Sequence, residues 1–154
     1  MSATTEYRDY WINPRIKIAA LWASMMFVFV CVDLFSLYRG DVRADIEAGK
    51  IAAFTIGQGY LLGVTIYVVV PSLILFLSLV LPVRAMRMAN IVLAVLYALT
   101  IAGSAVGEWN YFILGSLTEA ALLACIAYYA WTWPKVTHAV AAPSDQSRAD
   151  SQVH

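Results

Sequence analysis

The chain has 154 residues, of which 62% are hydrophobic and 13% are charged. An ordinary soluble domain has about 45–50% apolar and about 25% charged residues, so this composition excludes that class and favours a membrane protein of one domain. The ten acidic and ten basic residues balance, and the basic residues form no stripe, so we expect no nucleic-acid partner.

Four segments are apolar and long enough to cross a lipid bilayer, which takes about 20 residues per helix. They cover approximately residues 17–38, 56–81, 88–107 and 111–133. Backbone groups find no water in hydrocarbon, and the alternating pattern of barrel strands is missing from the sequence, so helices are the structure we expect. The sequence predicts an all-α fold, a bundle of four transmembrane helices over residues 17–134.

Two short segments flank the predicted bundle. Residues 1–16 contain Tyr7, Tyr10 and Trp11, which are typical of a membrane interface, and they lack the cleavage site of a signal peptide. We therefore expect the first apolar segment to stay in the membrane. Residues 135–154 are small and polar, which predicts a disordered tail.

The connection between the first two apolar segments, residues 39–55, mixes charged side chains with apolar ones such as Val42 and Ile46. This pattern predicts a short amphipathic helix on the membrane surface, on which Arg43 and Glu47 are spaced to pair. The helix is interpreted either as a solvated linker or as a lid over a pocket between the transmembrane helices.

The distribution of Lys and Arg indicates the orientation of the four spans. With four spans, both termini and the connection at residues 82–87 share one side of the membrane. That side carries seven basic residues, Arg8, Arg15, Lys17, Arg84, Arg87, Lys135 and Arg148. The other side carries three, Arg39, Arg43 and Lys50. Basic residues concentrate on the cytoplasmic side, so we expect a multi-pass protein of the cell membrane with both termini in the cytoplasm.

Two acidic residues, Asp33 and Glu119, interrupt the first and fourth apolar segments. A carboxylate in hydrocarbon is costly, so each is a candidate functional group. At about 1.5 Å per residue, Asp33 lies about 7 Å and Glu119 about 12 Å below the outer end of its helix. Because no basic residue accompanies Glu119, we expect this deeper carboxyl to be partly protonated near neutral pH.

Further polar residues are predicted near the same end of the bundle. They are Gln58, Ser104, Glu108 and Asn110. If Asp33 and Glu119 point inward, these six residues line one outward-opening pocket. Ser36 and Ser116 each lie three residues from one acid and could form a hydrogen bond with it. In the alternative interpretation, Asp33 reaches interfacial water and Glu119 bonds a neighbouring helix, so that both acids serve only packing.

Glycine and proline predict how the helices pack. Gly59 with Gly63, and Gly103 with Gly107, form GxxxG spacings near the outer ends of the second and third spans. Such small residues allow close approach, so we expect these two helices to touch there. Pro71 removes one backbone hydrogen bond in the second span and predicts a kink.

The residue types that perform common chemistry are sparse. Cys31 and Cys125 differ in depth by about 12 Å, too far for a disulfide, which predicts two buried free thiols. His138 and His154 are too isolated for a metal site, and no phosphate loop or nucleophile motif occurs. We therefore expect no metal, no cofactor and no catalytic residue.

Several short runs carry a resemblance to a known family. They are KIAALW at residues 17–22, IEAGK at 46–50, PSLILFLSLVLP at 71–82 and AWTWP at 130–134, together with Asp33, Arg87, Asn90 and Glu119. In these residues the chain resembles an uncharacterised bacterial family of small four-helix integral membrane proteins, a domain of unknown function. The resemblance implies the four-helix fold and brings no activity, substrate or cofactor. In layout the chain is also similar, more weakly, to DoxX-like four-helix proteins linked to membrane redox chemistry.

Three hypotheses for the function follow. The first is a non-enzymatic membrane protein, assembled as a homo-oligomer in the lipid bilayer, whose acid-lined pocket binds or passes a proton, a cation or a small amphipathic molecule. The second is a structural or accessory subunit in which the acids only secure helix packing. The third is a redox accessory protein that holds a quinone between its helices. An enzyme is the least favoured class, since no nucleophile–base pair is visible.

Overall fold

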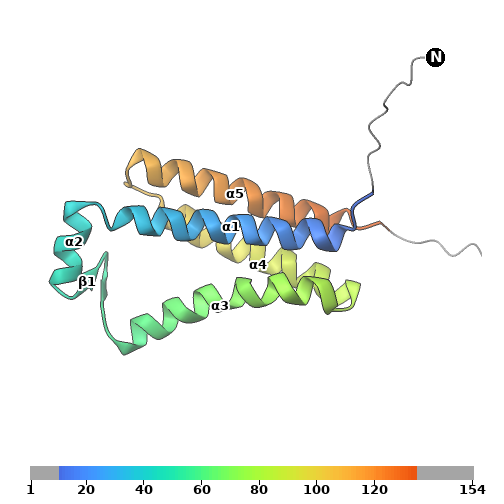
Figure 1. Ribbon diagram of the computed structural model, residues 1–154, viewed down its shortest axis with the longest axis horizontal. Helices are drawn as coiled ribbons and strands as arrows, with labels where there is room; N and C mark the ends of the chain where they lie inside the picture. The colour runs from blue at the N-terminus through green and yellow to red at the C-terminus, as the bar shows by residue number, and fades with distance from the viewer. Residues whose placement is uncertain (1–10, 135–154) are drawn as a thin grey trace, which may run out of the picture.

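The computed structural model describes residues 11–134, so the predicted tail and most of the N-terminal segment lie outside the described residues. The elements are α1 (Pro14–Ser36), α2 (Gly40–Glu47), β1 (Lys50–Ile51), β2 (Phe54–Thr55), α3 (Gln58–Val80), α4 (Val83–Ser104) and α5 (Asn110–Trp131). The four long helices are each apolar and long enough to cross a membrane (Figure 1). The predicted bundle of four transmembrane helices is therefore confirmed.

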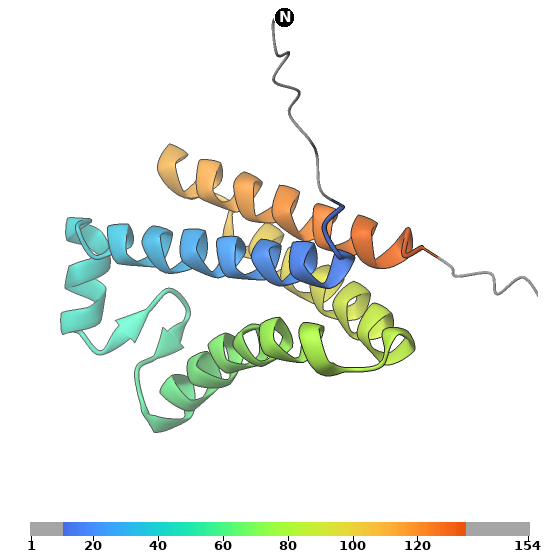
Figure 2. The same ribbon diagram turned by 45° about the vertical axis from the view of Figure 1, so that its right-hand side comes forward.

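The long helices pack in the order α3, α1, α5, α4. Helix α1 packs against both α3 and α5, and α4 packs against α5, whereas α3 and α4 make little contact with each other. Both described ends of the chain lie at one end of the bundle, together with the turn between α3 and α4 (Figure 1). We call this the terminal end, and the opposite end, which carries α2 and the two strands, the hairpin end. Figure 2 shows that α3 leads away from the rest of the bundle toward the hairpin end.

A dry core occupies the half of the bundle nearest the terminal end. Ile18, Trp22 and Met86 are fully buried there. The indole Nε1 of Trp22 donates a hydrogen bond to Oδ1 of Asn90 at 2.6 Å, and Nδ2 of Asn90 donates to the carbonyl of Met86 at 2.8 Å. Buried polar groups are costly unless they are paired, so this network allows an amide inside an apolar core.

Two arginines close helix ends at the terminal end. Arg15, in the first turn of α1, donates to the carbonyl of Leu81 at 2.7 Å, just past the end of α3. Arg87 of α4 donates to the carbonyl of Ala130 at 2.8 Å, near the end of α5. The last carbonyls of a helix lack helical partners and carry the negative end of its dipole. A guanidinium there donates hydrogen bonds to these carbonyls and places a positive charge at the negative end of the dipole. These contacts join neighbouring helices where the membrane interface begins.

The glycines predicted to bring two helices together do not do so. A Cβ atom at Gly59, Gly63, Gly103 or Gly107 would meet no other atom within 4 Å. The prediction that α3 and α4 touch at these positions is wrong, because small residues permit a close approach without causing one. The close approach lies instead between α1 and α5, where a Cβ at Gly115 would overlap the side chain of Val32.

The connection between α1 and α3 contains the predicted amphipathic helix as α2, followed by an antiparallel pair of two-residue strands that was not predicted. Gly49 adopts a positive φ of 74° after α2, and its carbonyl accepts a hydrogen bond from the N–H of Ile56 at 2.8 Å. The expected pair between Arg43 and Glu47 does not form. Within residues 11–134 both ion pairs involve Arg39.

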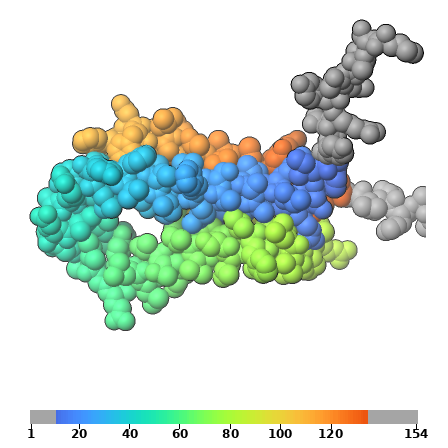
Figure 3. Space-filling view, in the orientation of Figure 1, coloured from blue at the N-terminus to red at the C-terminus, as the bar shows by residue number. Residues whose placement is uncertain are grey.

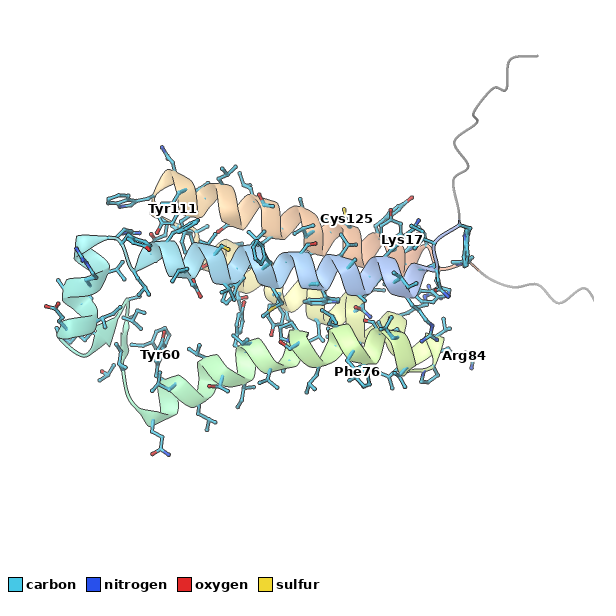
Figure 4. The ribbon with its side chains drawn as sticks, in the orientation of Figure 1. Lys17, Tyr60, Phe76, Arg84, Tyr111 and Cys125 are labelled. Carbon is cyan, nitrogen blue, oxygen red and sulfur yellow. The ribbon has the colours of Figure 1, made fainter. Side chains whose placement is uncertain are left out.

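The two cysteines are both free, as predicted. Cys31 is half-buried, whereas Cys125 is exposed on the outer surface of α5, so the prediction that both thiols are buried is wrong for Cys125. The prediction used only the depth of each cysteine along its span. Depth does not determine whether a side chain points toward lipid or toward the bundle. Figure 4 shows Cys125 on α5, away from the other long helices.

Candidate ligand-binding site

A cavity of about 240 Å³ lies between the four long helices, in their halves nearest the hairpin end. At about 30 Å³ per water molecule it has room for about eight waters. Its polar lining consists of Asp33, Thr100, Ser104, Ser116 and Glu119. Its aromatic lining consists of Phe29, Tyr67 and Phe112. Every long helix therefore contributes to the wall, and the two predicted acids, from α1 and α5, meet in one space.

Glu119 is buried but has no partner among the described residues. The residue is only 4% exposed, because it lies on the same face of α5 as Ser116 and Leu123, the face that packs into the bundle. Within residues 11–134 its carboxyl group makes no hydrogen bond to a side chain and no ion pair, although buried polar groups usually have a partner. No fully enclosed side-chain oxygen or nitrogen of this part of the chain lacks a partner, so the carboxyl oxygens of Glu119 remain accessible from the cavity.

Asp33 lies at the junction of two spaces. It lines the inner cavity and also a larger outer pocket of about 610 Å³ at the hairpin end. The outer pocket is lined by the end of α1, by α2, by β1, by the start of α3 with Tyr60 (Figure 4), and by Glu108 and Phe112. Figure 3 shows the molecule hollowed between α1 and the start of α3 at this end. Asp33 and Phe112 are the residues that line both spaces.

Charged residues surround the outer pocket. Arg39 pairs with Asp41 at 2.6 Å and with Glu108 at 2.5 Å, and its guanidinium lies 4.7 Å from the ring centroid of Trp109. The hydrogen bond to Asp41, followed by that to Glu108, raises the pKa of Arg39. In turn the Arg39 guanidinium holds the pKa of Asp41 below its usual value. Arg39 thereby ties the end of α1 to α2 and to the connection between α4 and α5.

The outer pocket carries more acidic than basic side chains. Its charged lining consists of Asp33, Arg39, Asp41, Asp45 and Glu108. Arg39 pairs with two of these acids, Asp41 and Glu108, and its single charge offsets one of their two negative charges. Asp33 and Asp45 have no ionic partner within residues 11–134. A cleft lined by one sign of charge attracts ions of the opposite sign. The approach to the inner cavity is therefore favourable for a cation.

Aromatic rings separate the inner cavity from the dry core. The ring centroids of Tyr67 and Tyr97 lie 4.6 Å apart, and those of Trp22 and Tyr97 lie 5.9 Å apart. Phe29 packs on Tyr67 from the side of α1, with its centroid at 5.7 Å. The polar half of the bundle thus ends at this layer, and the buried core around Trp22 begins beyond it.

The six residues predicted to share a pocket separate into three groups. Asp33, Ser104 and Glu119 line the inner cavity. Glu108 lines the outer pocket, where it pairs with Arg39. Gln58 and Asn110 line neither space, because each is the first residue of its helix and is exposed at the hairpin end.

The predicted serine contacts also differ. Ser36 bonds the carbonyl of Val32 at 3.1 Å and the hydroxyl of Tyr111 at 2.9 Å, so it does not support Asp33. Ser116 lines the cavity beside Glu119 but makes no side-chain hydrogen bond to it. The aromatic wall was not predicted, although the helical spacing of Phe112, Ser116 and Glu119 places Phe112 on the same face of α5 as the acid.

The chain matches the model of a protein family over residues 9–140. That family is described as a family of unknown function (DUF6326), and because the match spans most of the sequence, the chain belongs to it. A comparison with curated proteins and a comparison with solved structures each found no match. The resemblance to an uncharacterised four-helix family is confirmed, and the chain is a multi-pass membrane protein.

Proposed function

We propose that this member of a family without an assigned activity is a non-enzymatic membrane protein that binds a positively charged ligand, a proton or a cation, at Glu119. The observation that carries the proposal is that Glu119, a residue only 4% exposed, has a carboxyl group without a protein partner in the described chain that is accessible from a cavity. An acidic residue inside a membrane-spanning bundle is typical of ion and proton pathways.

The charge of the cavity supports this function. A carboxylate in a medium of low dielectric constant needs a counter-charge, and otherwise it takes up a proton. No Lys, Arg or His occurs among the described residues that line the inner cavity. Glu119 must therefore hold either a proton or an external cation, and exchange between the two is a binding event.

The proposed direction of access is from outside the cell. The outer pocket opens at the hairpin end, and the seven basic residues of the opposite side favour the cytoplasm for both termini. We therefore propose a protein of the cell membrane whose acids face the exterior. The α2 segment, held by Arg39, would cover the entrance, as in the interpretation of this helix as a lid.

The test compares wild-type protein with Glu119→Gln, which keeps the size of the side chain and removes its charge. Thermal unfolding of the full-length protein in detergent is followed over pH and over added sodium, potassium and ammonium salts. A ligand that binds only the folded state raises the unfolding temperature with its concentration. We expect the dependence on added cations in the wild type and in Glu47→Gln, a matched change on the exposed surface of α2, and its loss in Glu119→Gln.

The alternatives make different predictions in the same experiment. If the acids only secure packing, as in a structural or accessory subunit, Glu119→Gln will show the same dependence on added salt as the wild type. That outcome would refute the proposed function. In a quinone-linked redox accessory protein, stabilisation would come from a neutral quinone, and it would be largely independent of the salt.

A further inference from the structure

We infer that the ligand of the inner cavity is a small organic ammonium ion, with its charged nitrogen at Glu119 and its apolar part against the aromatic wall. The inference rests on the proposed function, because it names the ligand class for the same site. It depends on the carboxyl of Glu119, on the rings of Phe29, Tyr67 and Phe112, and on the size of the space that they share.

The charged end of the cavity suits an N–H donor. Glu119 offers two oxygens that accept no hydrogen bond from a side chain of residues 11–134, and Asp33 offers two more at the cavity mouth. An ammonium group supplies up to three N–H donors, and hydrogen bonds between ions are about twice as strong as neutral ones. One such ligand would satisfy Glu119 and bring the counter-charge that the protein does not provide.

The donor set does not suit a divalent metal ion. Calcium takes six to eight oxygen ligands and magnesium takes six. Within residues 11–134 no group of three or more His, Cys, Asp and Glu side chains is placed to hold a metal ion. The hydroxyls of Thr100 and Ser104, which donate to carbonyls of their own helix at 2.8 Å and 3.0 Å, are neutral and add no negative charge for a divalent ion.

The apolar wall favours an organic cation over a simple inorganic one. Three aromatic rings and the side chains of Val32 and Ile101 surround a space of about 240 Å³. A hydrated ion would leave this wall in contact with water, whereas a hydrocarbon body would displace that water and gain the hydrophobic contribution of burial. A cation within about 6 Å of an aromatic face is also attracted by the ring.

The outer pocket provides an entry route for the same chemistry. Asp33 and Asp45 lack ionic partners in the described chain, so they attract a cation toward the entrance. Asp33 lines both spaces, whereas Glu119 lines only the inner cavity. A cation would therefore pass from one carboxylate to a deeper one and become less hydrated on the way.

The experiment measures binding to full-length protein in detergent by calorimetry. The probe is benzylammonium chloride, with benzyl alcohol as the neutral analogue of similar shape and sodium chloride as the inorganic control. We expect saturable binding of benzylammonium, and binding weaker by at least about tenfold for benzyl alcohol and for Glu119→Gln, a factor that corresponds to about 1.4 kcal/mol. Phe112→Leu, which removes a ring, should weaken the binding of benzylammonium severalfold. Glu47→Gln should bind it as tightly as the wild type does.

Each contrary result has a distinct meaning. If sodium and benzylammonium bind equally well and both need Glu119, the ammonium assignment fails and the proposed function stands. If benzyl alcohol binds as tightly as benzylammonium, the charge is not recognised and the assignment fails as well. If Glu119→Gln changes the binding of neither protons nor any cation, both proposals fail. Should Glu119→Gln not fold, Glu119→Asp and the competition of protons with benzylammonium in the wild type decide between the same outcomes.

Discussion

The hydroxyl of Tyr97 in α4 donates a hydrogen bond to the backbone carbonyl of Tyr67 in α3, at 2.5 Å. Pro71 lies four residues after Tyr67 and has no N–H, so it leaves this carbonyl without its helical partner. Inside the hydrocarbon no water is available to replace that partner. A side chain of α4 thus completes the hydrogen bonding of α3, although the two helices otherwise make little contact.

This relationship predicts a coupling between Tyr97 and Pro71. Tyr97→Phe removes the donor and leaves a buried carbonyl unpaired, which should lower the free energy of unfolding by about 1–3 kcal/mol. In the Pro71→Ala background residue 71 has an N–H that can bond the Tyr67 carbonyl, so Tyr97→Phe should cost much less. The two costs are compared in a double-mutant cycle of unfolding by sodium dodecyl sulfate in mixed micelles. Equal costs in the two backgrounds would show that Pro71 does not create the need for Tyr97.

The contact between Gly115 and Val32 predicts a steric effect. Gly115→Ala places a methyl group where the Val32 side chain lies, and overpacking of this kind costs about 1–3 kcal/mol. Adding Val32→Ala should recover part of the loss, because it removes the atoms that clash. Gly103→Ala is the matched control, since its Cβ would enter open space in α4 and alanine favours a helix. Unfolding of these variants in mixed micelles gives the comparison, and a similar cost at Gly103 would contradict the steric explanation.

The pair between Arg39 and Asp41 predicts a response to acid at the hairpin end. Arg39 lowers the pKa of Asp41 in the folded protein below the ordinary value of 3.8. The pair therefore stabilises the attachment of α2 at pH values above the ordinary pKa of the carboxyl group. This contribution is lost as the pH falls through the lower pKa of the folded state. Hydrogen exchange of α2 amides, corrected for intrinsic rates, should show unchanged protection from neutral pH down to about pH 4, and loss of protection only below it.

A substitution imitates the acid state at neutral pH. Asp41→Asn removes the charge that pairs with Arg39 and should raise the exchange of α2 amides already at pH 7. Asp45→Asn changes an acid of the same helix that has no ion pair within residues 11–134, so it serves as the matched control. If both substitutions loosen α2 equally, the Arg39 pair is not what holds this segment.

The proposed orientation predicts which end of the bundle reacts with an impermeant reagent. In a Cys31→Ser, Cys125→Ser background, Asp45→Cys places a thiol at the hairpin end and Arg84→Cys places one at the terminal end, where Arg84 lies (Figure 4). A charged maleimide added to intact cells should label Asp45→Cys, and it should label Arg84→Cys only after permeabilisation. The reverse pattern would place the outer pocket in the cytoplasm and would remove the proposed access from outside.

Several features of the fold could be predicted because they depend on local sequence. Four apolar segments predicted four spanning helices, and the predicted ends lie close to the observed ends, with one exception. Helix α4 begins at Val83, five residues before the predicted start at residue 88, because Arg84 and Arg87 are not apolar but face the interface. The hairpin after α2 was missed, since two strands of two residues each leave almost no periodic pattern.

The candidate site could be predicted only in part. Asp33 and Glu119 were recognisable because an acid in hydrocarbon is unusual in any arrangement. Gln58 was predicted to line the same pocket but does not, because it is the first residue of α3 and is exposed at the hairpin end. Arg39 carries both ion pairs of the described chain, yet its partner Glu108 lies 69 residues away in sequence.

The sequence by itself determined that this chain forms a multi-pass helical membrane protein with two unusual acids. Hydrophobicity and length are local properties of each segment, and they decide whether that segment crosses a bilayer. Only the tertiary structure decided that Asp33 and Glu119 meet in one cavity, that Tyr97 completes the helix at Pro71, and that Gly115 rather than the GxxxG glycines carries a close helix contact. These features depend on the rotation and tilt of each helix against its neighbours. Many weak packing contacts set that rotation and tilt together, and no single segment encodes them.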